Sequence, residues 1–170
     1  RLTKSQKVRV AREELEEDMR SLLTKGVQLF SENKAEEAEP LFEEVIGIAR
    51  DLGNQKVEGR AIGNLASVFE ATGRHTEAIK LYEQSIEILK KFGDSRKEAR
   101  ILYNVSHSYL SLNRYDDALK FLNKSFKLTD DDDTRKAIMQ QLNVVQNAYE
   151  EEGFSEDEYD IPKPWTHHSY

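Results

Sequence analysis

Few residues in this sequence are of a type and spacing that could carry out a reaction. The histidines are His75, His107 and the adjacent pair His167 and His168, and no two of them lie four residues apart as a helical metal-binding pair would. The chain has no cysteine, which excludes thiolate metal sites and a cysteine nucleophile. No glycine-rich phosphate loop is present, and the runs of Glu are typical of a solvated helix surface. We therefore predict a protein that is not an enzyme and that needs no metal ion or cofactor.

A second set of polar residues recurs at one spacing and suits recognition instead. Arg20, Arg60 and Arg100 are evenly spaced along the chain, and Asn64 and Asn104 follow the last two arginines, each at i+4. Residues at i and i+4 share one face of a helix. A guanidinium group binds carboxylates in a forked geometry, and an Asn amide can donate to and accept from a peptide backbone at once.

The segments that carry these residues repeat as a whole with the same period. Residues 59–66 align with residues 99–106, and residues 77–80 align with 117–120. Apolar residues at i, i+3, i+4 and i+7 predict a first helix in each repeat, and a turn containing Gly or Asn precedes a second helix. The stripe of the second helix is Ala78, Tyr82, Ser85, Ile86 and Leu89, matched by Ala118, Leu122, Ser125, Phe126 and Leu128. One pair of helices cannot bury such faces alone, so the pairs must stack.

The repeat resembles the tetratricopeptide repeat (TPR) family. Small residues stand at Gly26, Ala66 and Ser106 and again at Ala38, Ala78 and Ala118, and large residues stand at Leu29, Phe69, Tyr109, Phe42, Tyr82 and Leu122. The 40-residue period is similar to that of the TPRs of kinesin light chains and spindle-orientation adaptors. The resemblance implies an all-α, right-handed solenoid of three helix pairs, with an N-terminal helix and a C-terminal capping helix.

We expect four segments along the chain. They are a basic, amphipathic helical extension (1–19), three TPR units (20–133, divided at about 20–55, 56–95 and 96–133), a capping helix (134–153) and an acidic, aromatic extended tail (154–170).

The resemblance also implies where a ligand binds. In this subclass an Arg and an Asn at the positions of Arg60, Asn64, Arg100 and Asn104 hold extended peptides in a concave groove, and Arg20 is a weaker candidate because its Asn is replaced. The other residues expected in the groove are Phe30, Ser67, Tyr103, His107, Leu110, Asn143 and Asn147. The alternative is structural: the arginines pair with neighbouring acids such as Glu58 and Glu98, and the asparagines cap contacts between repeats.

Charge and hydropathy narrow the class of partner. With 25 basic and 32 acidic residues the net charge is −7, which argues against a general nucleic-acid binder. No apolar run is long enough to span a membrane. The absence of Cys fits the cytoplasm or another reducing intracellular compartment. Arg1 in place of an initiator Met indicates a fragment or a processed chain, so we do not predict an organelle.

The tail leaves several interpretations open. Residues 150–160 hold seven acids and no base, and Tyr159, Trp165 and Tyr170 are candidate anchors. The tail is expected to dock in the groove of its own chain or of a second copy, to act as a linear motif on a partner, or only to keep the chain soluble.

Two hypotheses for function follow from these patterns. The first is a non-catalytic adaptor or scaffold that binds an extended, acidic segment of another protein in its concave groove. The second is a structural or assembly subunit of a larger organellar, cytoskeletal or ciliary complex, held by its termini and its convex face.

Overall fold

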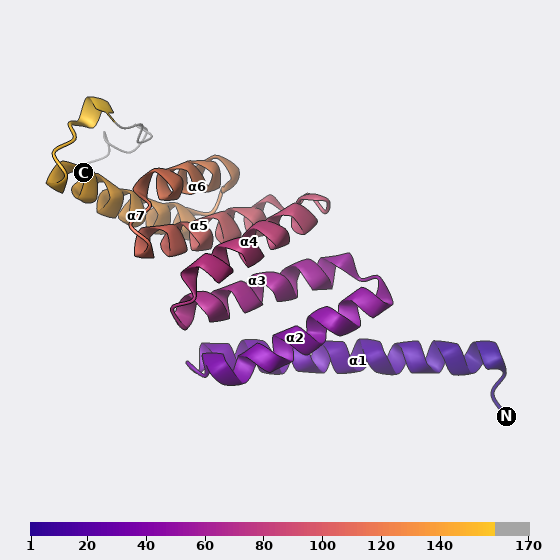
Figure 1. The fold of residues 1–170 in the computed structure, drawn as a ribbon. Helices are drawn as coiled ribbons and strands as arrows, with labels where there is room; N and C mark the ends of the chain where they lie inside the picture. The colour runs from indigo at the N-terminus through magenta and orange to yellow at the C-terminus, as the bar shows by residue number, and fades with distance from the viewer. Residues whose placement is uncertain (159–170) are drawn as a thin grey trace. The chain divides into compact units, whose positions relative to one another are not determined.

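The computed structural model describes residues 1–158 and is helical throughout its length (Figure 1). Its elements are α1 (Lys4–Ser31), α2 (Ala35–Leu52), α3 (Gln55–Ala71), α4 (His75–Lys90), α5 (Ser95–Ser111), α6 (Tyr115–Leu128), α7 (Asp132–Glu151) and the short 3-10 helix η1 (Glu156–Glu158). The described residues contain no β-strand, and the helices follow one another as hairpins joined by short turns. The all-α fold class predicted from the sequence is confirmed.

The chain divides into two compact modules. The N-terminal module, residues 1–92, holds α1 to α4; α1 packs on α2, α3 packs on α4, and α2 lies against α3. The C-terminal module begins at Gly93 and holds α5, α6 and α7, with α5 packed on α6 and α7 packed mainly on α6. The N-terminal module thus stacks two helix hairpins and the C-terminal module packs one hairpin against α7, as expected for a repeat that cannot bury its apolar face alone.

The first helix is much longer than its partner. Thr3 caps α1 through a reciprocal pair of hydrogen bonds with Gln6, and the helix then continues without a break into the first repeat. The Arg12 guanidinium donates to the carbonyl of Leu52, the last residue of α2, at 3.2 Å. The turns of α1 before this point therefore extend beyond α2 (Figure 1). Val8, on this extension, is 64 % exposed.

Each predicted turn contains a residue with left-handed backbone conformation. Asn33, Gly73 and Asn113 end the first helix of each pair with φ of 62°, 81° and 55°. Gly53 and Gly93 have φ of 67° and 66° and lie between pairs. Gly and Asn are the residues that adopt this conformation most readily, which explains why they recur with the period of the sequence.

Small residues allow the two helices of a pair to approach each other. A Cβ atom added at Gly26 of α1 would lie 2.7 Å from Phe42 Cε1 of α2, so this ring fills the space that Gly26 leaves. Ala38, Ala78 and Ala118 have no exposed surface. The small series on the first helices ends at α7, where the half-buried Gln146 occupies the corresponding position and donates to Glu150 at 3.0 Å.

Two buried serines also repeat with the period of the sequence. The Ser85 hydroxyl donates to the carbonyl of Gly59 and the Ser125 hydroxyl to that of Ala99, both at 2.7 Å. Both serines are fully buried, and the carbonyl provides each hydroxyl with the hydrogen-bond partner that a buried polar group requires. Each bond also joins the second helix of its pair to the first.

One residue of the predicted apolar stripe was placed wrongly. Leu128 was matched to Leu89, but it is 36 % exposed, whereas Thr129 is 4 % exposed. The strict period of the repeat brings Thr129 to the position of Leu89. Helix α6 ends at Leu128, and Thr129 is its C-cap, with its N–H donating to the carbonyl of Ser125. The turn between units differs here, since α7 begins at Asp132 with Asp131 as its N-cap. The period resumes within α7, where Leu142, Val145 and Tyr149 are buried one period after Leu102, Val105 and Tyr109.

An ion pair in the N-terminal module yields a first stability prediction. The Arg74 guanidinium donates to both carboxylate oxygens of Glu39, at 2.9 and 2.6 Å, and lies 3.8 Å from the centre of the Phe69 ring. This hydrogen bonding also lowers the pKa of Glu39. Lysine cannot reproduce the forked pair or stack as well on the ring. We expect Arg74→Lys to lower the free energy of unfolding by about 1 kcal/mol in urea melts. An equal effect of Arg9→Lys, whose pair with Glu13 is highly exposed, would contradict a special role for the fork.

Candidate functional site

The recurring Arg and Asn residues lie on the first helices of two pairs, one in each module. On α3, Arg60 is exposed and Asn64 is half-buried; on α5, Arg100 is exposed and Asn104 is half-buried. The helical spacing places each Asn one turn from its Arg on the same face. The two modules therefore present the same pair of side chains in the same local setting.

None of these four side chains forms a hydrogen bond or ion pair with residues 1–158. Glu58, which precedes Arg60 by two residues, pairs instead with Arg50 at 2.7 Å. Hydrogen bonds from Thr134 lower the pKa of the Asp131 carboxyl, and the positive charges of Arg96 and Arg100 lower it further. The hydrogen-bonding groups of the Arg/Asn pairs are thus open to a ligand.

The first arginine of the series is in a different setting. Arg20 lies on α1, where its guanidinium pairs with Glu17 at 2.9 Å, and both side chains are about two-thirds exposed or more. Thr24 occupies the position of the Asn, and its hydroxyl donates to the carbonyl of Arg20. Phe30, the predicted apolar residue of this helix, is half-buried against the core of the N-terminal module.

Ser67 on α3 belongs to a hydrogen-bonded group that the sequence did not predict. Its hydroxyl lies 2.9 Å from the Tyr82 hydroxyl, which donates to Glu70 at 2.7 Å. Burial raises the pKa of Glu70, while the bond from Tyr82 acts in the opposite direction. Burial, together with the charge of Glu70, also raises the pKa of Tyr82. These three side chains link α3 to α4 across the inside of their pair.

The predicted groove residues of α5 lie close to one another. Tyr103 and His107 meet edge to face, with ring centres 5.1 Å apart, and His107 Nε2 is 3.2 Å from the Tyr103 hydroxyl. Burial lowers the pKa of His107, which favours the neutral ring at pH 7. Leu110 is half-buried on the same helix.

The remaining predicted residues divide between α7 and the tail. Asn143 and Asn147 are both exposed on α7. Tyr159, Trp165 and Tyr170 lie outside the described residues. The predicted site residues that the structure describes thus lie on α1, α3, α5 and α7.

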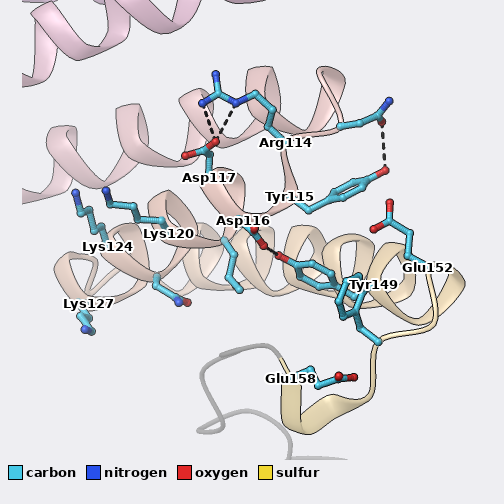
Figure 2. A pocket seen from close by; sticks show the side chains of 14 residues that line it. Arg114, Tyr115, Asp116, Asp117, Lys120, Lys124, Lys127, Tyr149, Glu152 and Glu158 are labelled. Atoms are coloured by element: carbon cyan, nitrogen blue, oxygen red, sulfur yellow. Dashed lines mark hydrogen bonds and ion pairs between the residues drawn. The ribbon is translucent and has the colours of Figure 1, made fainter.

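A groove that the sequence did not predict lies in the C-terminal module beside α6 (Figure 2). It encloses about 910 Å³. One wall is formed by Lys120, Lys124 and Lys127, which project from one side of α6. Tyr149, near the end of α7, and Glu158, after it, line another side. The apolar lining includes Leu119 and Phe154.

An aromatic cluster closes one end of this groove. The Tyr149 ring lies edge to face with Tyr115 and Phe154, at centre distances of 6.1 and 5.8 Å. The Tyr149 hydroxyl donates to Asp116, so that α6 and α7 are joined at this point. The spacing i, i+4, i+7 of the lysines could have revealed one wall, and Gly153, one period after Asn113, could have revealed the turn after α7. Only the packing of α7 on α6 brings the two together.

Within residues 1–158, no group of three or more His, Cys, Asp or Glu side chains is arranged to hold a metal ion. No helix of this part of the chain combines the length and the apolar character that crossing a bilayer requires.

Comparisons with known proteins agree with the fold. The model of the family described as tetratricopeptide repeat matches residues 17–91 and 57–131. No protein with a curated description matches the sequence. Among solved structures, the TPR domain of Arabidopsis FLU is similar with a TM-score of 0.63 and 19 % identity, over 66 % of this chain and 95 % of that one.

Two further structures show the same architecture. A Podosopora anserina putative kinesin light chain with nearly identical TPR-like repeats aligns with a TM-score of 0.60 and 15 % identity, over 82 % of this chain and 78 % of that one. The N-terminal domain of stress-induced protein-1 from C. elegans aligns with a TM-score of 0.56 and 14 % identity, over 72 % and 95 %. Because identities this low show the fold alone, membership rests on the family model, which covers more than half of the residues. The chain belongs to the tetratricopeptide repeat family.

Proposed function

We propose that this protein is a non-catalytic scaffold that binds extended, acidic segments of another protein at two faces. One carries Arg60 and Asn64 on α3, and the other carries Arg100 and Asn104 on α5. TPR domains generally mediate contacts between proteins, and the proposal adds the site and the chemistry of the ligand. The observation that carries it is the equivalence of the two Arg/Asn pairs, whose donors and acceptors have no partner within residues 1–158.

The chemistry of each pair suits an acidic peptide. An exposed guanidinium attracts a carboxylate and can bind it through two parallel hydrogen bonds. A half-buried Asn one turn away can bind a peptide N–H and C=O at once, which requires no particular side chain in the ligand. Tyr103 and Leu110, which are half-buried on α5, supply apolar surface nearby.

The proposal is tested with a peptide ligand selected for the purpose. A displayed library of random peptides is selected against the wild-type chain, and the best binder is titrated by fluorescence anisotropy. We expect acidic peptides to be enriched. Arg60→Glu/Arg100→Glu is expected to weaken binding at least about tenfold, equivalent to about 1.4 kcal/mol, because it replaces attraction of the carboxylates by repulsion. Asn64→Ala/Asn104→Ala is expected to weaken binding without changing the net charge.

The matched control is Lys80→Glu/Lys91→Glu, within α4 and at its C-cap and away from the Arg/Asn faces. Both lysines are exposed, and the change in net charge is the same as that of the arginine pair. If the control weakens binding as much as the arginine variant, the effect is one of total charge and the proposed site is wrong. Helicity measured by circular dichroism is expected to be unchanged in all three variants.

The second candidate function is that of an assembly subunit held by its ends. It is favoured by the extension of α1 beyond α2: Val8 on the extension and Leu15 just after it are 64 % and 41 % exposed. Residues 1–12 carry basic side chains and no acid. In this case deletion of residues 1–11 abolishes binding to the parent complex, and Arg60→Glu/Arg100→Glu has no effect on it.

A further inference from the structure

We propose that residues 159–170 of the chain dock in the groove beside α6, leaving the Arg/Asn faces to another protein. The groove and its lining residues all belong to the C-terminal module. The proposal does not depend on the function proposed above.

The direction of the chain after α7 is the first argument. Gly153 has a φ of 91°, a left-handed conformation that ends the helix and reverses the chain. The N–H of Phe154 then donates to the carbonyl of Tyr149 at 3.0 Å, and the Phe154 ring rests edge-on against the Tyr149 ring. Glu158, the last described residue, lines the groove. The described part of the chain thus ends at the rim of the groove, and residues 159–170 continue from this point.

The length of the remaining segment is sufficient. Twelve residues follow Glu158, and an extended chain advances about 3.3 Å per residue, or about 40 Å in total. From Leu119 to Lys127 the axis of α6 rises by only about 12 Å. The segment can therefore follow this part of α6 completely and still turn.

The lysine wall is the second argument, because the fold itself does not require it. One repeat period before Lys120, Lys124 and Lys127 the sequence has Lys80, Gln84 and Glu87, and two periods before them it has Pro40, Glu44 and Gly47. Three like charges at i, i+4 and i+7 repel one another on a helix. None of these ammonium groups forms an ion pair with residues 1–158. The acids that line the groove are Asp116, Asp117, Glu152 and Glu158. The docked segment adds Asp160, which reduces the repulsion along this face, and its one lysine, Lys163, can pair with the acids opposite.

The apolar surface of the groove is the third argument. Phe154 is 44 % exposed although it sits beside the buried Tyr149. The segment carries Ile161 and Trp165, which are large apolar residues, together with two tyrosines and two prolines. Burial of such side chains against Phe154 contributes in proportion to the area removed from water. The groove therefore matches both the acid at the start of the segment and the apolar residues that follow.

The experiment uses the single tryptophan of the protein. Trp165 is the only Trp in the chain, so its fluorescence reports on this segment alone. We expect the emission of the full chain to be shifted to shorter wavelength than that of a synthetic peptide of residues 159–170, and acrylamide to quench it several-fold less efficiently. Lys120→Glu/Lys124→Glu/Lys127→Glu is expected to move both values to those of the free peptide, because the lysine wall is then replaced by acids that repel Asp160.

A compensating change makes the assignment specific. Asp160→Lys, introduced into the triple variant, is expected to restore the shifted and protected emission. Phe154→Ser is expected to expose Trp165 without altering the charge of the groove. Circular dichroism verifies that every variant keeps its helices, and emission at several protein concentrations distinguishes docking within one chain from docking on a second copy.

Three outcomes overturn the proposal. Wild-type emission equal to that of the free peptide means that the segment does not dock. A loss of the shift in Arg60→Glu/Arg100→Glu, but not in the α6 variants, means that it occupies the Arg/Asn face. A shift that disappears on dilution means that a second copy provides the groove. The function proposed above fails separately, through the peptide titration.

Discussion

Phe42→Ala is expected to lower the free energy of unfolding by about 3–5 kcal/mol, the largest effect we predict for one substitution. The ring is 1 % exposed and fills the space above Gly26, where no side chain of α1 can replace it. Truncation therefore removes apolar surface from the core and leaves a cavity between α1 and α2. Urea unfolding followed by circular dichroism measures the loss. A cost below about 1 kcal/mol would mean that the two helices close over the cavity.

The contact with Gly26 makes a second variant informative. Gly26→Ala alone is expected to cost about 1 kcal/mol, since the strain against Phe42 exceeds the gain in helix propensity. In the Phe42→Leu background the added methyl group finds room, as Ser106 does opposite Leu122 in the third pair. The double variant is therefore expected to be more stable than the sum of the single changes predicts. Strict additivity would contradict direct packing between the two positions.

The buried group formed by Ser67, Glu70 and Tyr82 is expected to make stability depend on pH. Tyr82→Phe removes the donor that faces the Glu70 carboxylate and should cost about 1–3 kcal/mol at neutral pH. Because burial raises the pKa of Glu70, folding favours the protonated form of this side chain. As pH rises from about 4.5, the ordinary value for Glu, through the raised value, the folded protein loses stability relative to a chain without this acid.

Glu70→Gln isolates this dependence. The amide can still accept the hydrogen bond from Tyr82 but carries no charge. We expect the variant to match the wild type below pH 4.5 and to become progressively more stable than it as pH rises, until Glu70 is fully ionised in the folded protein. Urea melts at a series of pH values measure the difference. A difference that is constant across the series would show that ionisation of Glu70 does not contribute, and the cost of Tyr82→Phe should then be independent of pH as well.

The period of the sequence predicted the fold because the residues that recur with it determine local structure, namely helix faces and turns. The spacing of Ile62, Leu65 and Phe69 specifies a buried helix face, and Gly73 and Asn113 specify the left-handed turns. The expected match of Leu128 to Leu89 failed because α6 ends at Leu128 and the strict period places the buried Thr129 at the position of Leu89. The spacing of apolar residues predicts which face of a helix is buried, but it does not predict the residue at which α6 ends.

Only the part of the candidate site that recurs with the repeat could be predicted from the sequence. Arg60, Asn64, Arg100 and Asn104 could be identified because the same pair of side chains recurs with the fold, and their lack of partners within residues 1–158 keeps the peptide-binding hypothesis open. The Ser67–Tyr82–Glu70 group could not be predicted, since it depends on two helices meeting at one point. The groove beside α6 could not be predicted, since it depends on the packing of α7 on α6, which brings Tyr149 and Phe154 beside the lysines.

The position that holds Gly26, Ala66, Ser106 and finally Gln146 has a consequence for engineering longer versions of the array. A further copy of residues 55–94 inserted after Asn54 would bring its own Ala or Gly to each close contact between helices. At the other end α7 has the place of a first helix, so the array would be extended with a copy of residues 75–114. The leading helix of this copy would meet the long side chain of Gln146, which leaves it no room to approach. Replacing Gln146 by Ala is therefore the first change that a designer should make before extending the chain at that end.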